Sequence, residues 1–95
     1  MVRWGILGLG RAANSFANAI REVKNARLTA IASLTKNNNL EFGKKFNIEK
    51  NFQFSNYEDL INSKEIDAVY IATLNNKHAD LIIKSIQAKK KFYVK

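Results

Sequence analysis

Hydrophobic and polar positions alternate along the first residues of the chain and then give way to an uninterrupted apolar run. Val2, Trp4 and Ile6 fall on one face of this segment and Leu7 falls on the other, which predicts a buried strand over residues 2–10. From residue 11 the period changes to that of an amphipathic helix. Its apolar stripe is expected to consist of Ala12, Phe16, Ala19, Ile20 and Val23.

The alternation of strand and helix continues along the rest of the chain. Further strands are predicted over residues 27–34, 52–55, 66–74 and 91–95, and further helices over residues 40–48, 55–64 and 78–89. This order predicts an α/β fold, a Rossmann-type doubly wound parallel sheet of five strands with four helices, truncated after the fifth strand. The most apolar strand, residues 66–74, is expected at the centre of the sheet.

Smaller patterns refine three of the helices. Ser55 or Asn56 is expected to cap the third helix, because the acidic residues that follow are well placed in its first turn. The second helix is expected to carry the apolar residues Leu40, Phe42, Phe46 and Ile48, and the last helix to bury Leu81, Ile82, Ser85 and Ile86.

Length and composition bound the class of protein. A chain of 95 residues forms one domain at most, and its hydrophobic content of 46% is that of a globular protein. The amino-terminus lacks a secretory signal, and no segment approaches the roughly 20 apolar residues that span a bilayer, so we expect a soluble cytoplasmic protein. The absence of cysteine excludes disulfides and thiolate ligands, and the single histidine, His78, cannot build an imidazole zinc site, so we expect no metal.

The formal net charge of +8 raises the possibility of a polyanionic partner. The lysines are spread over residues 24–95 and cluster only at residues 89–91. There is no aromatic interleaving and no recognition helix. We therefore expect neither a nucleic acid nor a membrane as partner.

Three of the four glycines lie within six residues, between the first strand and the first helix. Gly8, Gly10 and Ala13 spell G-x-G-x-x-A at this junction, which predicts a site for the pyrophosphate of a dinucleotide. Gly8 would allow the tight turn, Gly10 the approach of the phosphates, and Ala13 the close packing of the helix. The alternative is a turn with a purely structural role. Arg11 either contacts a phosphate or is solvated.

The tip of the second strand bears on the choice between NAD and NADP. An acidic residue there binds the ribose 2′-hydroxyl and repels a 2′-phosphate. The tip consists of Ser33, Leu34, Thr35, Lys36 and Asn37 and has no acid. This favours NADP, with Ser33, Thr35 and Lys36 as donors to its 2′-phosphate. The alternative is NAD, with Lys36 as an ordinary loop lysine.

Two segments, "VRWGILGLGRAANSF" and "YEDLINSKEIDAVYIATLNNKHADLIIKSIQAKKKFYV", resemble the amino-terminal half of the Gfo/Idh/MocA oxidoreductases. The segment "IATLNNKH" is similar to that family's A-T-P-x-x-x-H motif, and "RWGILG" is similar to its dihydrodiol and sugar dehydrogenase branch. The resemblance implies an NAD(P)-dependent enzyme that moves hydride to or from a carbon bearing a sugar, cyclitol or related hydroxyl. It implies that residues 1–95 are an incomplete dinucleotide-binding domain, without the catalytic and substrate domain that also forms the oligomer interface.

The resemblance also suggests which residues face the cofactor. They are Gly8, Leu9, Gly10, Arg11 and Ala12 at the pyrophosphate, Ser33, Leu34 and Lys36 at the ribose, and Thr73, Leu74, Asn75, His78 and Lys95 toward the nicotinamide. No catalytic residue is assigned, and we expect the chain alone to be inactive. The alternative function is a non-catalytic nucleotide-binding or scaffold module on the same fold. His78 could instead do no more than cap backbone groups.

Three positions depart from the family pattern. Leu74 replaces a proline, Lys89 replaces a glycine that ends the fourth helix, and Leu34 stands where NADP-using members often carry arginine. Lys95 falls on the glutamate of the family's E-K-P motif when counted without a gap. A one-residue deletion would make it the active-site lysine instead.

Overall fold

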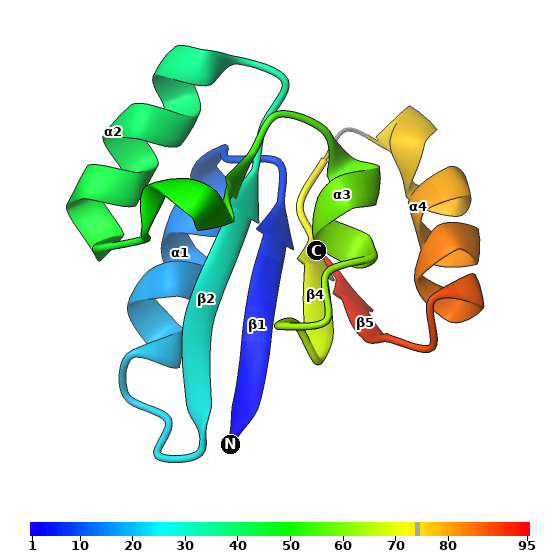
Figure 1. The fold of residues 1–95 in the computed structure, drawn as a ribbon, viewed down its shortest axis with the longest axis horizontal. Helices are drawn as coiled ribbons and strands as arrows, with labels where there is room; N and C mark the ends of the chain where they lie inside the picture. The colour runs from blue at the N-terminus through cyan, green and yellow to red at the C-terminus, as the bar shows by residue number, and fades with distance from the viewer. Residues whose placement is uncertain (74) are drawn as a thin grey trace.

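The computed structural model describes residues 1–73 and 75–95 (Figure 1). Its strands and helices, in chain order, are β1 (Val2–Leu7), α1 (Arg11–Ile20), β2 (Ala26–Ala32), α2 (Lys36–Phe46), the short 3-10 helix η1 (Lys50–Phe52), β3 (Gln53–Phe54), α3 (Tyr57–Ile61), β4 (Ala68–Ile71), α4 (Asn75–Gln87) and β5 (Lys91–Val94). The predicted order of five strands and four helices is confirmed.

All strand pairs in the sheet are parallel, in the order β3-β2-β1-β4-β5. The chain runs outward from β1 through β2 to β3, returns past β1, and continues through β4 to β5, which confirms the doubly wound topology. The central strand is therefore β1, and the expectation that residues 66–74 lie at the centre is wrong. A strongly apolar strand is one that is buried on both faces of the sheet. Both β1 and its neighbour β4 are buried in this way, so apolar content does not determine which of them is central.

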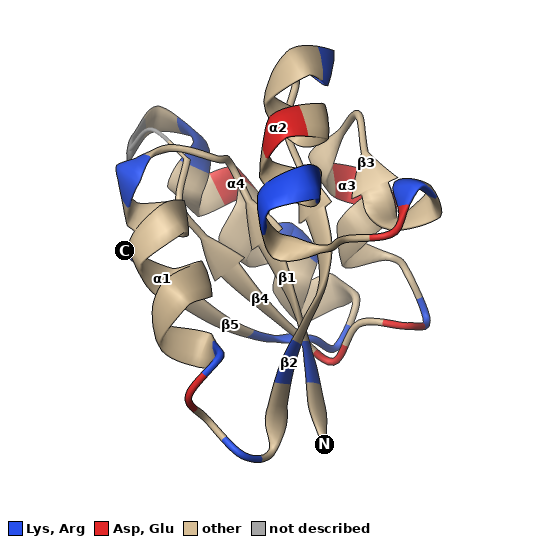
Figure 2. Ribbon diagram, turned by 90° about the vertical axis from the view of Figure 1, so that its left-hand side faces the viewer, with Lys and Arg blue, Asp and Glu red and all other residues tan. Residues whose placement is uncertain are grey.

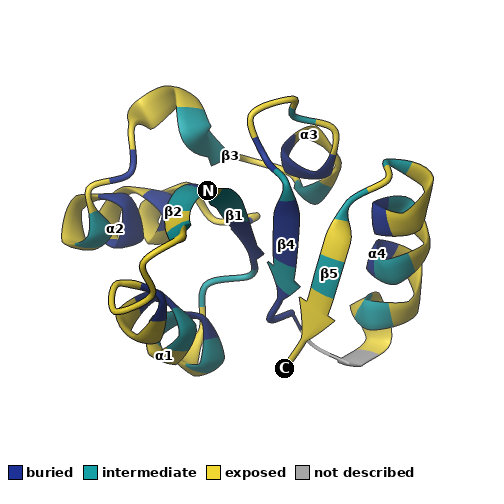
Figure 3. Cartoon of the chain, turned by 90° about the horizontal axis from the view of Figure 1, so that it is seen from below, coloured by how far each residue is buried: buried dark blue, intermediate teal, exposed yellow. Residues whose placement is uncertain are grey.

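Two hydrophobic clusters lie on opposite faces of the sheet (Figure 3). On one face, Ile6 packs with Ala13 and Ala17 of α1 and with Phe42 of α2. On the other face, Leu7, Ala30, Ala32, Val69 and Ile71 pack with Leu60 and Ile61 of α3 and Leu81 of α4. The alternation predicted for residues 2–7 thus places successive side chains of β1 in different layers.

The buried stripe of α1 differs from the expected one. The helix ends at Ile20, and Val23 beyond it is 54% exposed. The buried residues are Ala13, Ala17 and Ile20. Ala12 and Phe16 of the expected stripe are partly buried against the same cluster, whereas Ala19 is exposed. The small alanines let the helix approach the sheet closely, so the stripe is centred on them.

The second helix begins earlier than expected. It starts at Lys36, so the polar run before Leu40 is helical. It ends at Phe46, and the C-cap residue Asn47 adopts a left-handed conformation with φ of 59°. Ile48 lies beyond the helix but is buried, while Leu40 is exposed. Asn39 in this polar run is buried, and its backbone N–H donates to O of the N-cap residue Thr35 at 3.3 Å.

The third and fourth helices confirm most of their predicted details. Asn56 caps α3, because its Oδ1 accepts a hydrogen bond of 2.8 Å from the backbone N–H of Asp59. In α4, Leu81 and Ser85 are buried as expected, but Ile86 is 59% exposed. The helix starts at Asn75, ahead of the expected start at His78. No helix in the described part of the chain is long and apolar enough to cross a membrane.

Candidate functional site

The carboxyl ends of the strands meet along one edge of the sheet. Hydrogen bonds that continue the ladders hold the segments after them together: Gly8 N–H donates to Ala32 O at 2.9 Å, and Ala72 N–H donates to Leu7 O at 2.9 Å. Lys95 N–H donates to Ile71 O at 3.1 Å. The direction of winding reverses between β1 and β4, so the crevice that binds ligands in such sheets opens beside Gly8.

Gly8 is required by the fold itself. Its φ is +89°, a left-handed conformation that side chains disfavour. A Cβ atom there would lie 3.0 Å from Cγ2 of Thr73, at the end of β4. The first glycine of the motif therefore allows the turn after β1 to pass close against the β4 segment, as the sequence predicts.

Gly10 has a different environment. Its φ of −93° suits any residue, and a Cβ atom there would meet no atom within 4 Å among the described residues beyond its chain neighbours and its own helix. The fold thus places no demand for glycine at this position, and the space that a side chain would take is open. An approaching ligand would use this space, so the second glycine fits a cradle for phosphates.

The amino-terminus of α1 presents unpaired backbone N–H groups to the same space. Gly10 is the N-cap and supplies no side-chain acceptor, and the first turn contains no acidic residue. The first backbone bond of the helix runs from Asn14 N–H to Gly10 O at 3.1 Å, so the N–H groups of residues 11–13 lack helical partners. An anion is stabilised at such a terminus, and Arg11 is exposed beside it.

Thr73 and His78 join the end of β4 to α4. Thr73 is buried and lies against the turn at Gly8 together with Ala72, yet its Oγ1 has no hydrogen-bond partner among the described residues. The Nε2 of His78 donates to Thr73 O at 2.7 Å. His78 therefore secures the backbone of this turn. Leu74 lies outside the described residues, and Asn75 begins α4.

The tip of β2 contains no acid, as predicted, but its residues differ in exposure. Ser33 is buried, and its Oγ accepts a hydrogen bond of 3.2 Å from Thr35 N–H. Leu34 is 65% exposed, and Lys36 is the exposed first residue of α2. Lys36 and Leu34 are thus exposed at the surface of the tip, whereas the hydroxyl of Ser33 is already hydrogen-bonded inside it.

Asn39 is the residue of this region that sequence reasoning missed. It is buried below α2, and its side-chain amide bonds the backbone at two separate segments. A buried asparagine in a run of three gives no local signal, because its partners belong to other parts of the chain.

A small cavity of about 220 Å³ lies next to the glycine turn. Leu9, Asn14 and residues of α2 line it.

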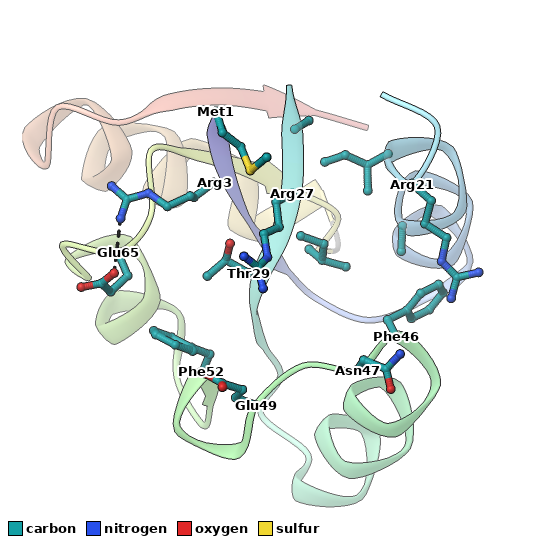
Figure 4. Close-up of a pocket in the computed structure, with 14 residues that line it drawn as sticks. Met1, Arg3, Arg21, Arg27, Thr29, Phe46, Asn47, Glu49, Phe52 and Glu65 are labelled. Carbon is teal, nitrogen blue, oxygen red and sulfur yellow. Dashed lines mark hydrogen bonds and ion pairs between the residues drawn. The ribbon is translucent and has the colours of Figure 1, made fainter. Parts of the chain in front are cut away.

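A larger cavity lies elsewhere. It has a volume of about 680 Å³ and adjoins the amino end of β2, with Met1, Arg21, Arg27, Phe46 and Phe52 among its lining residues (Figure 4). Helix amino-termini and the switch in winding are at the opposite end of the strands. The anion-binding chemistry therefore identifies the glycine turn, and not the larger cavity, as the candidate site.

The charges do not form a single surface stripe. Figure 2 shows lysine and arginine on α1, α2, β2 and several loops, with acidic residues interleaved. Within the described residues, no cluster of three or more histidine, cysteine or acidic side chains could hold a metal ion. The groups that converge at the carboxyl edge are thus backbone N–H groups, a hydroxyl and isolated cations.

A glycine turn that opens the first helix at the switch point of a parallel sheet defines a dinucleotide-binding Rossmann domain. The chain belongs to the Gfo/Idh/MocA family, described as an oxidoreductase family with an NAD-binding Rossmann fold, which it matches over residues 2–94. It is similar to the trans-1,2-dihydrobenzene-1,2-diol dehydrogenase of Mus musculus, with 31% identity over 94% of this chain and 27% of the relative. It is also similar to the myo-inositol 2-dehydrogenase of Thermotoga maritima, with 30% identity over 94% of this chain and 26% of the relative.

Solved structures show the same fold. The scyllo-inositol dehydrogenase of Lactobacillus casei with bound NAD(H) and scyllo-inositol has a TM-score of 0.88 and 26% identity, covering 99% of this chain and 27% of its own. The biliverdin reductase of Synechocystis, in complex with biliverdin and NADP+, has a TM-score of 0.89 and 31% identity, covering 98% of this chain and 28% of its own. The chain thus spans about a quarter of the length of these proteins.

Proposed function

We propose that the protein to which this domain belongs is an NAD(P)-dependent dehydrogenase acting on a hydroxyl of a sugar, cyclitol or related polyol. The open space at Gly10, in front of the uncapped amino-terminus of α1, is the observation that carries the proposal. The diol and inositol dehydrogenases among the relatives support the substrate class. When bound, the nicotinamide would accept or donate hydride; the domain would hold and orient it.

The residues present fit such a cofactor in this proposal. The turn at residues 8–12 and the first N–H groups of α1 receive the pyrophosphate. The tip at Ser33, Leu34 and Lys36 lies toward the adenosine ribose. Thr73, whose buried Oγ1 has no partner among the described residues, and the segment through Asn75 and His78 lie toward the nicotinamide side, with Leu74 outside the described residues. Lys95, at the end of β5, continues the same edge of the sheet.

The chemistry of the substrate hydroxyl requires a second set of groups. Removing or returning its proton calls for an acid-base partner beside the nicotinamide. The site at the glycine turn contains backbone donors and exposed cations, and we assign none of its residues as the acid-base partner. The proposal places the partner, and most of the substrate pocket, in a further domain, as expected where the relatives are about four times as long.

The finer proposal is a preference for NADP over NAD. It rests on the absence of an acid at the tip of β2 and on Lys36, which is exposed at the first position of α2, where a 2′-phosphate would approach. A lysine acts as a point charge without the planar fork of arginine. The preference is therefore modest, about 1–2 kcal/mol or roughly tenfold in affinity.

Replacing Lys36 by alanine tests this preference. Titration of the chain with both cofactors at low salt should show that Lys36→Ala weakens NADP binding about tenfold and leaves NAD binding within a factor of two. Lys44→Ala removes the same charge from the far end of α2 and is the matched control. Equal affinities of the unmodified chain, or a Lys36→Ala variant with an unchanged ratio, would contradict the preference.

A further inference from the structure

Asn39 connects three segments that meet at the tip of β2. Its side chain is 4% exposed. The two hydrogens of Nδ2 go to separate carbonyls, Phe54 O at 2.8 Å and Ser33 O at 3.2 Å. Its own backbone N–H donates to Thr35 O at 3.3 Å. One residue of α2 thus bonds the end of β2, the start of α2 and the end of β3.

These bonds determine the backbone path of the tip. Ser33 N–H donates to Phe54 O at 3.2 Å, and Thr35 N–H donates to the Ser33 hydroxyl at 3.2 Å. With the Asn39 amide on Ser33 O, the backbone N–H and C=O of Ser33 are both bonded. The exposed residues Leu34 and Lys36 then project from a short segment whose ends are held.

The pairing of β2 with β3 provides little support by itself. It comprises only two residue pairs, Ile31 with Gln53 and Ala32 with Phe54. Without the amide of Asn39, Ser33 O would lose its donor inside the protein, and a buried carbonyl without a donor is unfavourable. The tip would then gain freedom to move away from the sheet edge.

We propose that Asn39 is a positioning residue for cofactor selection: it holds the tip of β2 so that Lys36 faces the 2′ group of the adenosine ribose. The proposal rests on the proposed function, because the 2′ group belongs to the bound dinucleotide. Asn39 itself is buried and touches no ligand. It acts through the backbone of residues 33–36, whose orientation decides which groups meet the ribose.

The first test is hydrogen exchange of the ligand-free chain. Asn39→Ala should raise the exchange rates of the amides of Ser33 and Thr35 at least tenfold. The amide of Ala72, which donates to Leu7 O in the centre of the sheet, should be unchanged and reports global stability. Leu40→Ala, on the next and exposed position of α2, is the matched control. Unchanged exchange at both tip amides, or an equal rise at Ala72, would overturn the proposal.

The second test is the ratio of NADP to NAD affinity. A variant that is partly unfolded loses affinity for both cofactors by the same factor, so its ratio stays constant. Displacing the tip should instead weaken NADP more than NAD, about fivefold or more in the ratio. The isosteric Asn39→Asp, which removes both donors without a cavity, should behave like Asn39→Ala. An unchanged ratio in both variants would overturn the proposal, whereas an unmodified chain that binds neither dinucleotide would contradict the proposed function.

Discussion

At the scale of single residues, Gly8 and Gly10 belong to one motif but meet different requirements. Gly8 is held at a positive φ against Thr73, so the fold requires a glycine there. Gly10 has an ordinary φ and lies at open space, so the fold does not require a glycine there, and its lack of a side chain leaves room for an approaching group. The sequence motif predicted both positions, but the distinction between them needed the backbone angles and the position of Thr73.

The ion pair between Arg3 and Asp67 joins the starts of β1 and β4, and sequence reasoning did not find it. Arg3 Nε donates to Oδ2 at 3.0 Å and its terminal nitrogen donates to Oδ1 at 2.9 Å, while Arg3 N–H donates to Oδ2 at 2.8 Å. These hydrogen bonds lower the pKa of Asp67 from 3.8 to about 2. The partners are 64 residues apart, so no local pattern indicates them.

Because the pKa of Asp67 is lower in the folded than in the unfolded chain, its ionised carboxylate stabilises the folded state at pH values above the unfolded pKa. This stabilisation is lost as the pH falls from about 4 to about 2. The Asp67 side chain is 39% exposed, so solvent screening limits the effect to about 1 kcal/mol. Asp67→Asn should lower the free energy of unfolding by this amount at neutral pH, with a difference that shrinks on acidification. Urea denaturation across this range measures it, and Glu22→Gln is the control for loss of an exposed charge. A difference independent of pH would contradict the assignment.

Among the secondary-structure elements, the period of hydrophobicity predicted the α-helices and strands of the described residues, but neither their ends nor the short helix η1. Ile86 matches the helical period of α4 yet is exposed, because the stripe that packs on the sheet is narrow and centred on Leu81 and Ser85. In α2 the polar Asn39 is buried, and its side chain donates to Phe54 O, which is 15 residues away in the sequence. Ends and exposed flanks of elements therefore depend on tertiary contacts that the local pattern does not contain.

At the end of α4, the backbone conformation disfavours the residue that adopts it. Lys90 N–H donates to Ser85 O at 2.9 Å and Lys89 N–H to Ile86 O at 3.0 Å, the bond pattern of a helix end with a left-handed residue. That residue is Lys89, with φ of 59°. The strain expected from a lysine in place of the family's glycine is thus present in the backbone.

Replacing this lysine should stabilise the domain. Lys89→Gly removes the Cβ penalty, and after the added freedom of the unfolded chain the free energy of unfolding should rise by about 0.5–1 kcal/mol. Thermal or urea unfolding measures the change. Lys89→Ala removes the same long side chain but keeps Cβ, so it should not stabilise. Equal effects of the two substitutions would show that charge, and not backbone strain, governs this position.

At the scale of the whole molecule, the alternation of elements predicted a doubly wound sheet, and the family resemblance predicted the same domain. Strand order was beyond local reasoning, because it depends on which side of β1 each crossover packs. The candidate site follows from that order: it lies where β1 and β4 are neighbours, between Gly8 and Thr73. The last strand, β5, is mostly exposed, as an edge of the described sheet.

We propose that the turn at Gly8 and Gly10 binds the pyrophosphate of a nicotinamide dinucleotide. Gly10→Val is the substitution that tests this, because the structure offers open space for the side chain and the backbone is extended. The loss of a favourable N-cap residue should reduce stability by about 1 kcal/mol at most, so the variant should fold.

Calorimetric titration of the unmodified chain and of Gly10→Val with NADP and NAD is the decisive measurement. We predict weak, saturable binding by the unmodified chain and at least tenfold weaker binding of both dinucleotides by the folded variant, because the valine side chain keeps the phosphates from the amino-terminus of α1. A folded Gly10→Val chain that binds either dinucleotide as tightly as the unmodified chain would contradict the claim and leave the glycines as a structural turn.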